Sequence, residues 1–206
     1  MSIAQSVFLA IPLAVSIAYA AEFPAPVVDT PAPAHKKKET AILAGGCYWG
    51  VEAVFDRLKG ISEVESGFAK GDQSGDAGHA ESVKITYDPS KISYGQLLEV
   101  FFAVVHDPTE LNRQGPDIGA EYRSVIFYSN DEQKRVAEAY IEQLNKAGVY
   151  PRPIVTAVAA LAKFQAVDES QQHFVDRNQN NPYVVANDLP KLKQLQQQFP
   201  DLAKHH

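Results

Sequence analysis

Cys47 is the residue whose place in the sequence most strongly suggests chemistry. It is the only cysteine, it follows Gly45 and Gly46, and it directly precedes a stretch with helical periodicity. The two glycines permit a tight turn and a close approach of the backbone to a ligand. A thiol at the start of a helix faces unpaired amides and the positive end of the helix dipole, which stabilise the thiolate. The sequence therefore predicts a nucleophilic Cys47, with a small buried apolar residue as the alternative.

Other side chains could complete a site around this sulfur. Tyr48 and Trp49 follow Cys47 directly and could form an apolar cradle for a small group of a ligand, or could pack in the core. Glu81 lies where a glycine-containing loop enters a strand with alternating apolar residues. A carboxyl beside a thiolate and aromatic rings would have a raised pKa and could donate a proton, whereas an exposed surface carboxylate is the alternative. His79 is expected to hold the loop by hydrogen bonding.

Metal binding is a weaker interpretation. The acidic residues from Asp72 onward hint at a calcium loop, but Ala77 and Val83 stand where that loop needs glycine and glutamate. A site built around Cys47 and its neighbours would lack a fourth evident ligand. We therefore expect no metal ion.

Composition narrows the class of protein. The chain has 206 residues and a formal net charge of −6, which argues against a nucleic-acid partner because such proteins normally present a basic face. A hydrophobic share of 45% is sufficient for the core of one ordinary domain. A single cysteine excludes an intrachain disulfide and a cysteine-rich zinc or iron–sulfur site.

The first 38 residues are expected to precede the domain. Residues 7–20 form an apolar run that is too short for a comfortable membrane span and ends in Ala18-Tyr19-Ala20, the pattern after which a signal peptidase cuts. Residues 1–20 thus predict a signal peptide and an exported chain, periplasmic or secreted, although they lack the usual Lys or Arg; an uncleaved anchor is the alternative. Residues 21–38 are rich in proline and end in three lysines, which predicts an extended linker.

Hydrophobic periodicity over residues 39–206 predicts an α+β domain. The predicted order is β-α-β-β-α-β-α-β, followed by a coil-rich C-terminal tail with short helices. This order favours a mixed sheet with helices, built on a ferredoxin-like split β-α-β core with added elements. The expected strands are 40–44, 62–68, 82–87, 123–128 and 154–161, and the expected helices are 51–58, 94–105, 131–147, 168–177 and 190–199.

Several segments resemble one family. Gly45–Glu52 reads GGCYWGVE and resembles the GCFWG signature of the peptide-methionine (S)-S-oxide reductase family, known as MsrA. Gly75–Glu81 reads GDAGHAE and resembles the family's GxTGHAE segment. The stretch 87–94 resembles its YDPxxISY segment, and 106–124 resembles its HDPT…RQGxDxGxxYRS block. The segments keep the family's order from about Thr40 to Tyr128, and the tail resembles the family's end more loosely.

The resemblance implies a reaction. The Cys47 thiolate would attack the sulfur of a methionine sulfoxide in a protein or peptide, or of the free amino acid, and would be left as a sulfenic acid. Glu81 would protonate the sulfoxide oxygen, with Tyr122 as a hydroxyl donor and Asp117 acting through water. The aromatic pair after the cysteine would pack on the substrate methyl group. The implied catalytic residues are Cys47, Glu81, Tyr122 and Asp117, and the implied substrate-binding residues are Tyr48, Trp49 and His79. The implied reaction requires no metal and no organic cofactor.

Departures from the family's pattern bear on activity and on partners. Tyr48 stands where the family usually has Phe, and Glu121 stands where it usually has Gln, which adds a charge beside Tyr122. The loop between Phe68 and Glu81 is short and lacks a tyrosine that the family usually carries there to hold the sulfoxide oxygen. Many members also reduce the sulfenic acid with a second, C-terminal cysteine. This chain has none, so it would need an external thiol, from a thioredoxin-like protein or of the glutathione type.

Three functions remain open from the sequence. The first is a working one-cysteine reductase that acts as a monomer. The second is an impaired relative that binds oxidised methionine or a partner without turnover. The third is another thiol enzyme, a hydrolase or a peroxidase. A hydrolase would need a histidine near the sulfur, and the pair His106-Asp107 is better interpreted as part of a turn with the aspartate as a cap.

Overall fold

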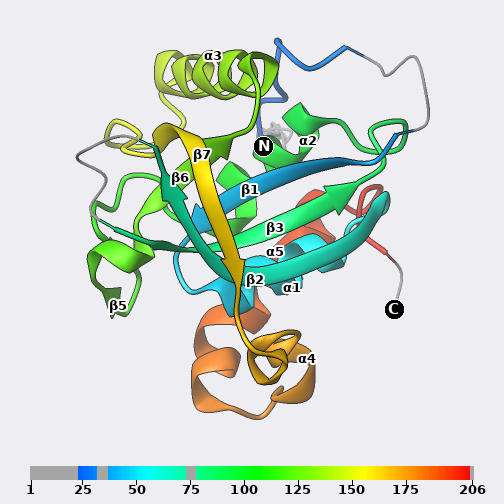
Figure 1. Cartoon of the computed structure of the whole chain (residues 1–206), viewed down its shortest axis with the longest axis vertical. Helices are drawn as coiled ribbons and strands as arrows, with labels where there is room; N and C mark the ends of the chain where they lie inside the picture. Colours follow the sequence, from blue (N-terminus) through cyan, green and yellow to red (C-terminus); the bar gives the residue numbers. More distant parts are fainter. Residues whose placement is uncertain (1–22, 32–36, 73–77, 205–206) are drawn as a thin grey trace, which may run out of the picture.

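A computed structural model describes residues 23–31, 37–72 and 78–204 of the chain (Figure 1). The expected signal peptide at residues 1–20 and most of the short loop after Gly71 lie outside the described residues. Within the described part, no helix is both long and apolar enough to cross a membrane.

Five strands form a closed barrel in the order β1-β3-β2-β7-β6 (Figure 1). β3 pairs antiparallel with both β1 and β2, and β6 pairs antiparallel with β1. β7 closes the barrel, because it pairs antiparallel with β2 on one side and parallel with β6 on the other. The bounds are β1 (Glu39–Gly45), β2 (Ile61–Gly71), β3 (Ala80–Tyr87), β6 (Ser124–Tyr128) and β7 (Ala157–Ala166).

The expected mixed sheet with helices is confirmed, but the ferredoxin-like detail is not. β3 does lie between β1 and β2, the two strands that helix α1 (Tyr48–Asp56) connects. However, β7 begins and ends later than predicted and joins the two outer strands, so the sheet has no free edge there. Hydrophobic periodicity marks where a strand lies and not which strand it pairs with, so closure was not visible in the sequence.

Two helices, α2 and α3, begin at residues whose side chains cap the helix. Helix α2 begins with a capping box between Ser93 and Gln96. Helix α3 begins where Asn130 accepts a hydrogen bond from the Gln133 amide at 2.9 Å, and it ends at Gly148, which has a left-handed φ of 62°. The remaining bounds are α2 (Tyr94–Val100), η1 (Phe101–Val105), η2 (Ala120–Tyr122), α3 (Asp131–Ala147), η3 (Glu169–Gln171), α4 (Phe174–Arg177), η4 (Val184–Asp188) and α5 (Leu189–Gln198).

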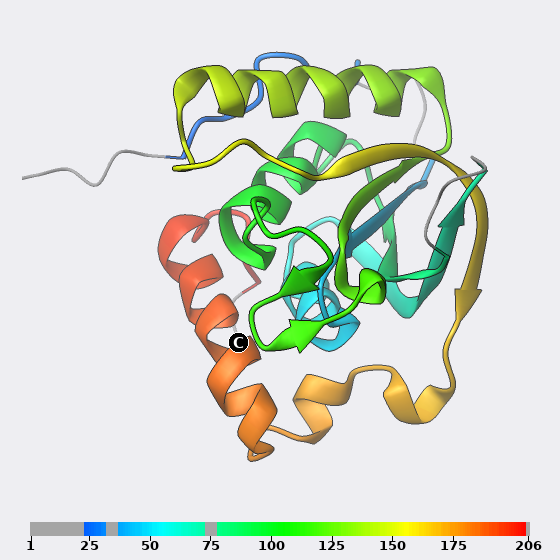
Figure 2. The same cartoon turned by 90° about the vertical axis from the view of Figure 1, so that its left-hand side faces the viewer.

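Helix α1 is the element through which the barrel meets the C-terminal segment. Its buried face, which includes Val51, Val54 and Phe55, packs against β2 and β3 within the main core. It also contacts α4, η4 and α5, which lie together below and beside the barrel (Figures 1 and 2). The short helices expected in the tail are present, as η3 and α4 within 168–177 and as α5 over most of 190–199. With η4 they leave less coil than predicted, and their apolar residues are buried against α1.

The described part of the expected linker lies against the domain. Residues 23–31 run beside α3 (Figure 2) and have no regular secondary structure. Tyr140 and Gln143 of α3 hydrogen-bond to the backbone of this segment. Asp29 accepts a hydrogen bond from the Gly95 amide at 2.7 Å and so satisfies a first-turn amide of α2. This part of the chain is therefore attached to the domain by hydrogen bonds rather than lying free as a tether.

Candidate active site

Cys47 lies at the junction of β1 and α1, where it is the N-cap residue of the helix. The chain turns there through Gly46, whose φ is 91°. A Cβ at this position would lie 2.6 Å from the Gln114 side chain, so only glycine fits. The Cys47 side chain is buried, with a relative exposure of 8%. The sequence prediction of a cysteine at a strand-to-helix turn is therefore confirmed.

The charge state of Cys47 differs from the expectation. Burial raises the pKa of the thiol to about 12, and the charges of Glu81 and Asp188 add to this effect. The Trp49 amide at the start of α1 and the Tyr183 hydroxyl favour the thiolate, but they do not outweigh burial. The expectation that the helix start holds a thiolate was thus wrong for the protein without substrate. Burial of the sulfur, which a sequence does not report, decides its charge.

Glu81 is an acidic residue held beside the start of α1, next to Cys47. It is the second residue of β3, and its Oε2 accepts a hydrogen bond from the Tyr48 amide at 3.0 Å. Burial raises the pKa of Glu81 to about 7, opposed by this hydrogen bond and aided by the charges of Asp117 and Glu121. Glu81 therefore keeps its proton to a much higher pH than an ordinary glutamate. This is the state that a proton donor needs.

The loop between η1 and β6 brings two further predicted residues to this site. It contains the short hairpin of β4 (Arg113–Gln114) and β5 (Asp117–Ile118), followed by η2. Asp117 accepts a hydrogen bond from the Tyr183 hydroxyl. Burial and the charges of Glu81, Asp117 and Cys47 raise the pKa of Tyr122, so these groups are near enough to interact electrostatically. The structure thus brings together the predicted catalytic residues.

Aromatic rings form one wall of the site. Trp49 stacks on Phe174 with ring centroids 3.8 Å apart and an interplanar angle of 9°, and Tyr183 lies edge-on to Trp49 at 5.9 Å. Tyr48 is buried and meets Phe68 edge-on at 5.9 Å. Tyr48 therefore packs mainly in the core, whereas Trp49 is only partly buried and belongs to an aromatic cluster that reaches the surface.

His79 takes part through its backbone. Its side chain is exposed at the start of β3. Arg123 donates hydrogen bonds to the carbonyl oxygens of Gly78 at 2.8 Å and of His79 at 3.4 Å, so the loop end is fixed by an arginine. The backbone carbonyl groups of Gly78 and His79, and not the imidazole, form the hydrogen bonds that hold this end of the loop. A role of the imidazole in substrate binding stays a prediction.

His106 and Asp107 both form hydrogen bonds that stabilise the local fold. Asp107 accepts hydrogen bonds from the amide and the hydroxyl of Thr109, at 2.8 and 2.7 Å, so the predicted aspartate cap is confirmed. His106 hydrogen-bonds through Nδ1 to the Phe101 carbonyl at 3.1 Å and through Nε2 to the Ser124 hydroxyl at 2.7 Å. Burial lowers the pKa of His106 to about 3, so the ring is neutral and both of its nitrogens are occupied.

Sequence reasoning missed most of what the C-terminal segment contributes. Phe174 and Tyr183 belong to the aromatic wall, and Asp188 lies behind α1 beside Gly50. A Cβ on Gly50 would lie only 2.2 Å from Oδ1 of Asp188. The loose likeness of the tail to the family's end, which includes Tyr183, was the one available signal.

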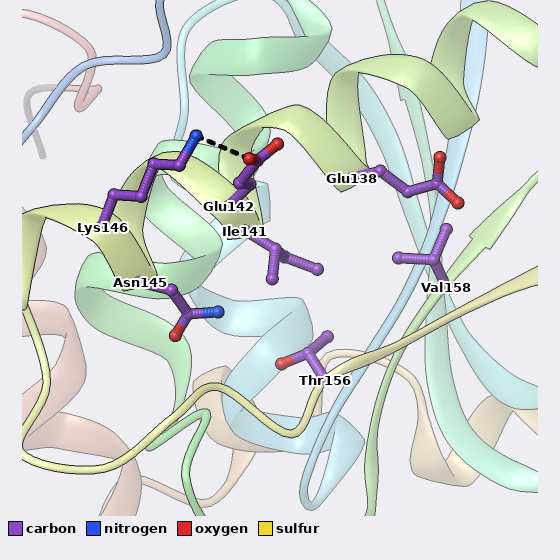
Figure 3. A pocket seen from close by; sticks show the side chains of 7 residues that line it. All are labelled: Glu138, Ile141, Glu142, Asn145, Lys146, Thr156 and Val158. Atoms are coloured by element: carbon purple, nitrogen blue, oxygen red, sulfur yellow. Dashed lines mark ion pairs between the residues drawn. The ribbon is translucent and has the colours of Figure 1, made fainter.

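A cavity on another face of the molecule is distinct from this site. It has a volume of about 670 Å³ and lies between α3 and β7 (Figure 3). Its wall includes an ion pair between Lys146 and Glu142 at 2.6 Å. None of the predicted site residues lines it. In the described ranges, no group of three or more His, Cys, Asp or Glu side chains is arranged to hold a metal ion.

Comparisons with known proteins agree with the geometry. The family model for peptide methionine sulfoxide reductase matches residues 39–203. The chain is 52% identical over 173 residues to peptide methionine sulfoxide reductase MsrA 2 of Mesorhizobium japonicum, covering 80% of this chain and 89% of the relative. It is 43% identical over 192 residues to MsrA 2 of a Synechocystis species, covering 88% and 90%.

Solved structures show the same likeness at lower identity. Reduced Mxr1 from Saccharomyces cerevisiae superposes with a TM-score of 0.61 and 29% identity, over 70% of this chain and 88% of that one. Methionine sulfoxide reductase A of Corynebacterium diphtheriae superposes with a TM-score of 0.58 and 27% identity, over 77% and 87%.

Proposed function

We propose that this chain, which belongs to the peptide methionine sulfoxide reductase family, reduces methionine-S-sulfoxide in proteins and peptides by a one-cysteine mechanism. The observation that carries the mechanism is the hydrogen bond from the Tyr48 amide to Glu81. It holds a carboxyl whose pKa is raised to about 7 beside the residue that follows Cys47. A nucleophilic sulfur and a proton donor side by side are what the reduction of a sulfoxide requires.

The reaction balances with these two groups alone. The Cys47 sulfur attacks the sulfur of the sulfoxide while Glu81 gives its proton to the sulfoxide oxygen. The sulfur–oxygen bond of the substrate breaks, and the protonated oxygen bonds to the Cys47 sulfur. The transient bond between the two sulfur atoms breaks at the same time, and its electron pair leaves with methionine. Cys47 is oxidised by two electrons to a sulfenic acid. The proton lost by the thiol restores Glu81, so no proton is gained or lost overall.

Cys47 and Glu81 form a coupled pair, which explains how a thiol with a high pKa can react. The charge of Glu81 is one of the causes that raise the pKa of Cys47, and it disappears when Glu81 is protonated. A substrate oxygen that hydrogen-bonds to protonated Glu81 therefore also removes a negative charge from beside the sulfur. Thiolate formation is favoured at the moment when the substrate is in place.

The surrounding residues fit the two ends of the substrate sulfoxide. Tyr122 and Asp117 lie close to Glu81 and would bind the oxygen, directly and through water. The partly buried Trp49 would contact the methyl group, since apolar sulfur substituents pack well on aromatic rings. The Tyr183 hydroxyl, which hydrogen-bonds to Asp117, would orient that carboxylate.

Regeneration requires a partner, because the chain has no second cysteine. An external thiol would attack the sulfenic acid and form a mixed disulfide with loss of water, and a second thiol would then release Cys47. A thioredoxin-like protein or a small thiol of the glutathione type has this chemistry. One chain supplies Cys47, Glu81 and Tyr122, which supports action as a monomer.

Export is a separate proposal that rests on residues 1–20 alone. Their apolar run and the Ala18-Tyr19-Ala20 pattern support cleavage after Ala20 and a periplasmic or secreted mature chain. N-terminal sequencing of the protein from the producing cells would test it. A mature chain that begins at Ala21 is expected, and an intact Met1 in a soluble cell extract would contradict export.

A single-turnover assay tests the reaction. Reduced protein from residue 21 onward is mixed with the S epimer of a methionine-sulfoxide peptide, with no recycling thiol. About one methionine per Cys47 and a trapped sulfenic acid are expected, since one thiol supplies two electrons. The Cys47→Ser variant should release none. Binding without methionine release would instead favour the impaired relative, and equal use of the R epimer would contradict the proposed stereochemistry.

A further inference from the structure

Gln114 lies directly against the turn that carries Cys47. It is the second residue of β4, and its side chain is partly buried. A Cβ on Gly46 would lie 2.6 Å from Cγ and 2.7 Å from Cβ of Gln114, so the two residues are in close contact. Gly46 directly precedes Cys47, the N-cap residue of α1. The aliphatic part of one glutamine side chain therefore supports the backbone that carries the sulfur.

The amide group of the same side chain joins the hairpin to the chain that leaves η1. Its Oε1 accepts a hydrogen bond from the Asp107 amide at 3.1 Å, and its Nε2 donates one to Oε2 of Glu110 at 2.9 Å. The same Glu110 oxygen accepts a hydrogen bond from the Gly115 amide at 2.7 Å. The oxygen and the nitrogen of the Gln114 amide are thus both bonded, which holds the side chain in one place on Gly46.

Gln114 is also the cross-strand partner of Asp117. The hairpin pairs Gln114 of β4 with Asp117 of β5. A hydrogen bond of 3.1 Å from the Gly119 amide to the Asn112 carbonyl closes the base of the hairpin, and η2, which ends at Tyr122, follows directly. Directly opposed residues of an antiparallel pair have Cα atoms only about 4.5 to 5.5 Å apart, so a shift of Gln114 carries Asp117 with it.

We propose that Gln114 is a positioning residue that sets the distance between the Cys47 sulfur and the oxygen-binding group Asp117. Its side chain contacts the residue before the sulfur, and its backbone pairs with the residue that would bind the sulfoxide oxygen. The inference rests on the proposed function, in which Asp117 stabilises the oxygen as the bond to sulfur breaks. A displacement of about 1 Å between groups that act together can slow a reaction about a hundredfold.

Double-mutant kinetics test whether Gln114 acts through Asp117. The rate of methionine formation in a single turnover is measured at saturating sulfoxide peptide for Gln114→Ala, Asp117→Asn and the double variant. Gln114→Ala should slow this rate about ten- to a hundredfold with little change in the half-saturating peptide concentration, because the hairpin acts in the transition state. The double variant should be no more than about twofold slower than Asp117→Asn, since misplacing a group that is already lost has no further effect.

Hydrogen exchange supplies a second readout that needs no turnover. The Gly119 amide donates to the Asn112 carbonyl and the Tyr122 amide donates to the Gly119 carbonyl, both at 3.1 Å, and neither bond involves Gln114. Both amides should exchange several-fold faster in Gln114→Ala, because the hairpin loses its support on Gly46 and opens more often.

Gln143→Ala is the matched control for both measurements. Gln143 of α3 likewise accepts one backbone hydrogen bond, from Val27 at 2.9 Å, and donates another, to Ala25 at 2.7 Å, but it joins α3 to the N-terminal segment. It should change neither the rate nor the exchange at the hairpin. If Gln114→Ala does not fold, Gln114→Met takes its place, because it keeps a side chain of similar length on Gly46 and loses only the hydrogen bonds.

Three results would overturn the proposal. They are additive losses in the double variant, a normal rate in Gln114→Ala or in Asp117→Asn, and unchanged exchange at Gly119 and Tyr122. No methionine from the unaltered protein would instead refute the reductase function, and the exchange rates alone would then decide whether Gln114 positions the hairpin.

Discussion

Glu81 accepts a hydrogen bond from the backbone amide of Tyr48 at 3.0 Å, across 33 residues of sequence. The acid is therefore attached to the first turn of the helix that begins with Cys47, and no side chain is needed to hold it there. β3 makes this possible because it pairs with β1, which leads directly into the Cys47 turn. The pairing of β1 with β3 thus brings Glu81, the proton donor, close to the turn that carries Cys47.

Replacement of Glu81 by Gln should have opposite effects on two reactions of Cys47. The amide keeps an acceptor for the Tyr48 amide but cannot give up a proton, so methionine formation in a single turnover should slow by about 10²- to 10⁴-fold. The same change removes a negative charge that raises the pKa of Cys47, so alkylation by iodoacetamide should become several-fold faster.

Glu63→Gln is a suitable control for this variant, because it changes an exposed glutamate on the neighbouring strand β2. It should leave both rates unchanged. Slower alkylation together with slower turnover in Glu81→Gln would indicate general disruption of the site and would argue against a proton-donor role.

Trp49 should report substrate binding by its fluorescence, since it is the only tryptophan. Phe174→Leu removes the ring stacked on Trp49, and such contacts contribute about 0.5 to 1.5 kcal/mol. We expect KM for a sulfoxide peptide to rise about two- to tenfold with a smaller change in kcat, and the emission to shift. Phe23→Leu alters an aromatic contact with Tyr150 instead and serves as the control. An unchanged KM in Phe174→Leu would remove this ring from the binding wall.

Asp188 should make the stability of the fold depend on pH. The pKa of Asp188 is about 6 in the folded protein, against an ordinary value of 3.8, so the folded state binds this proton more tightly than the unfolded state. This proton binding contributes fully to the free energy of unfolding below pH 3.8, and the contribution is lost as the pH rises through 6. Asp188→Asn should thus be more stable than the natural protein at pH 8, by about 2 to 3 kcal/mol, and equal to it near pH 3.5. Urea unfolding at several pH values measures this, and a variant less stable at pH 8 would refute it.

The N-terminal segment should contribute to stability. Asp29→Ala removes the acceptor for the Gly95 amide in the first turn of α2, a change that should cost about 1 kcal/mol, as for other capping residues. The urea midpoint should fall, and it should fall further in a chain that begins at residue 37. Asp201→Ala, at an exposed position, is the matched control. An unchanged midpoint in both altered forms would show that residues 23–31 do not stabilise the domain.

Local residue order was enough to predict several features correctly. Two glycines before a cysteine and a helical pattern after it predict a strand-to-helix turn, and the structure has that turn at Cys47. Alternation of apolar residues predicts a strand over 82–87, and β3 lies there; helical periodicity predicts a helix over 131–147, and α3 has these bounds. These features depend on contacts within a few residues, so the local sequence is sufficient to predict them.

Tertiary structure alone decided the closure of the barrel, the second half of the site and the charge of the sulfur. β7 pairs with strands that are far from it in sequence, and Phe174 and Asp188 reach α1 only because the C-terminal segment packs on that helix. The pKa of Cys47 is likewise determined by the folded chain. A helix start favours the thiolate in any sequence, but burial and the sum of nearby charges exist only once the chain has folded, and here they prevail.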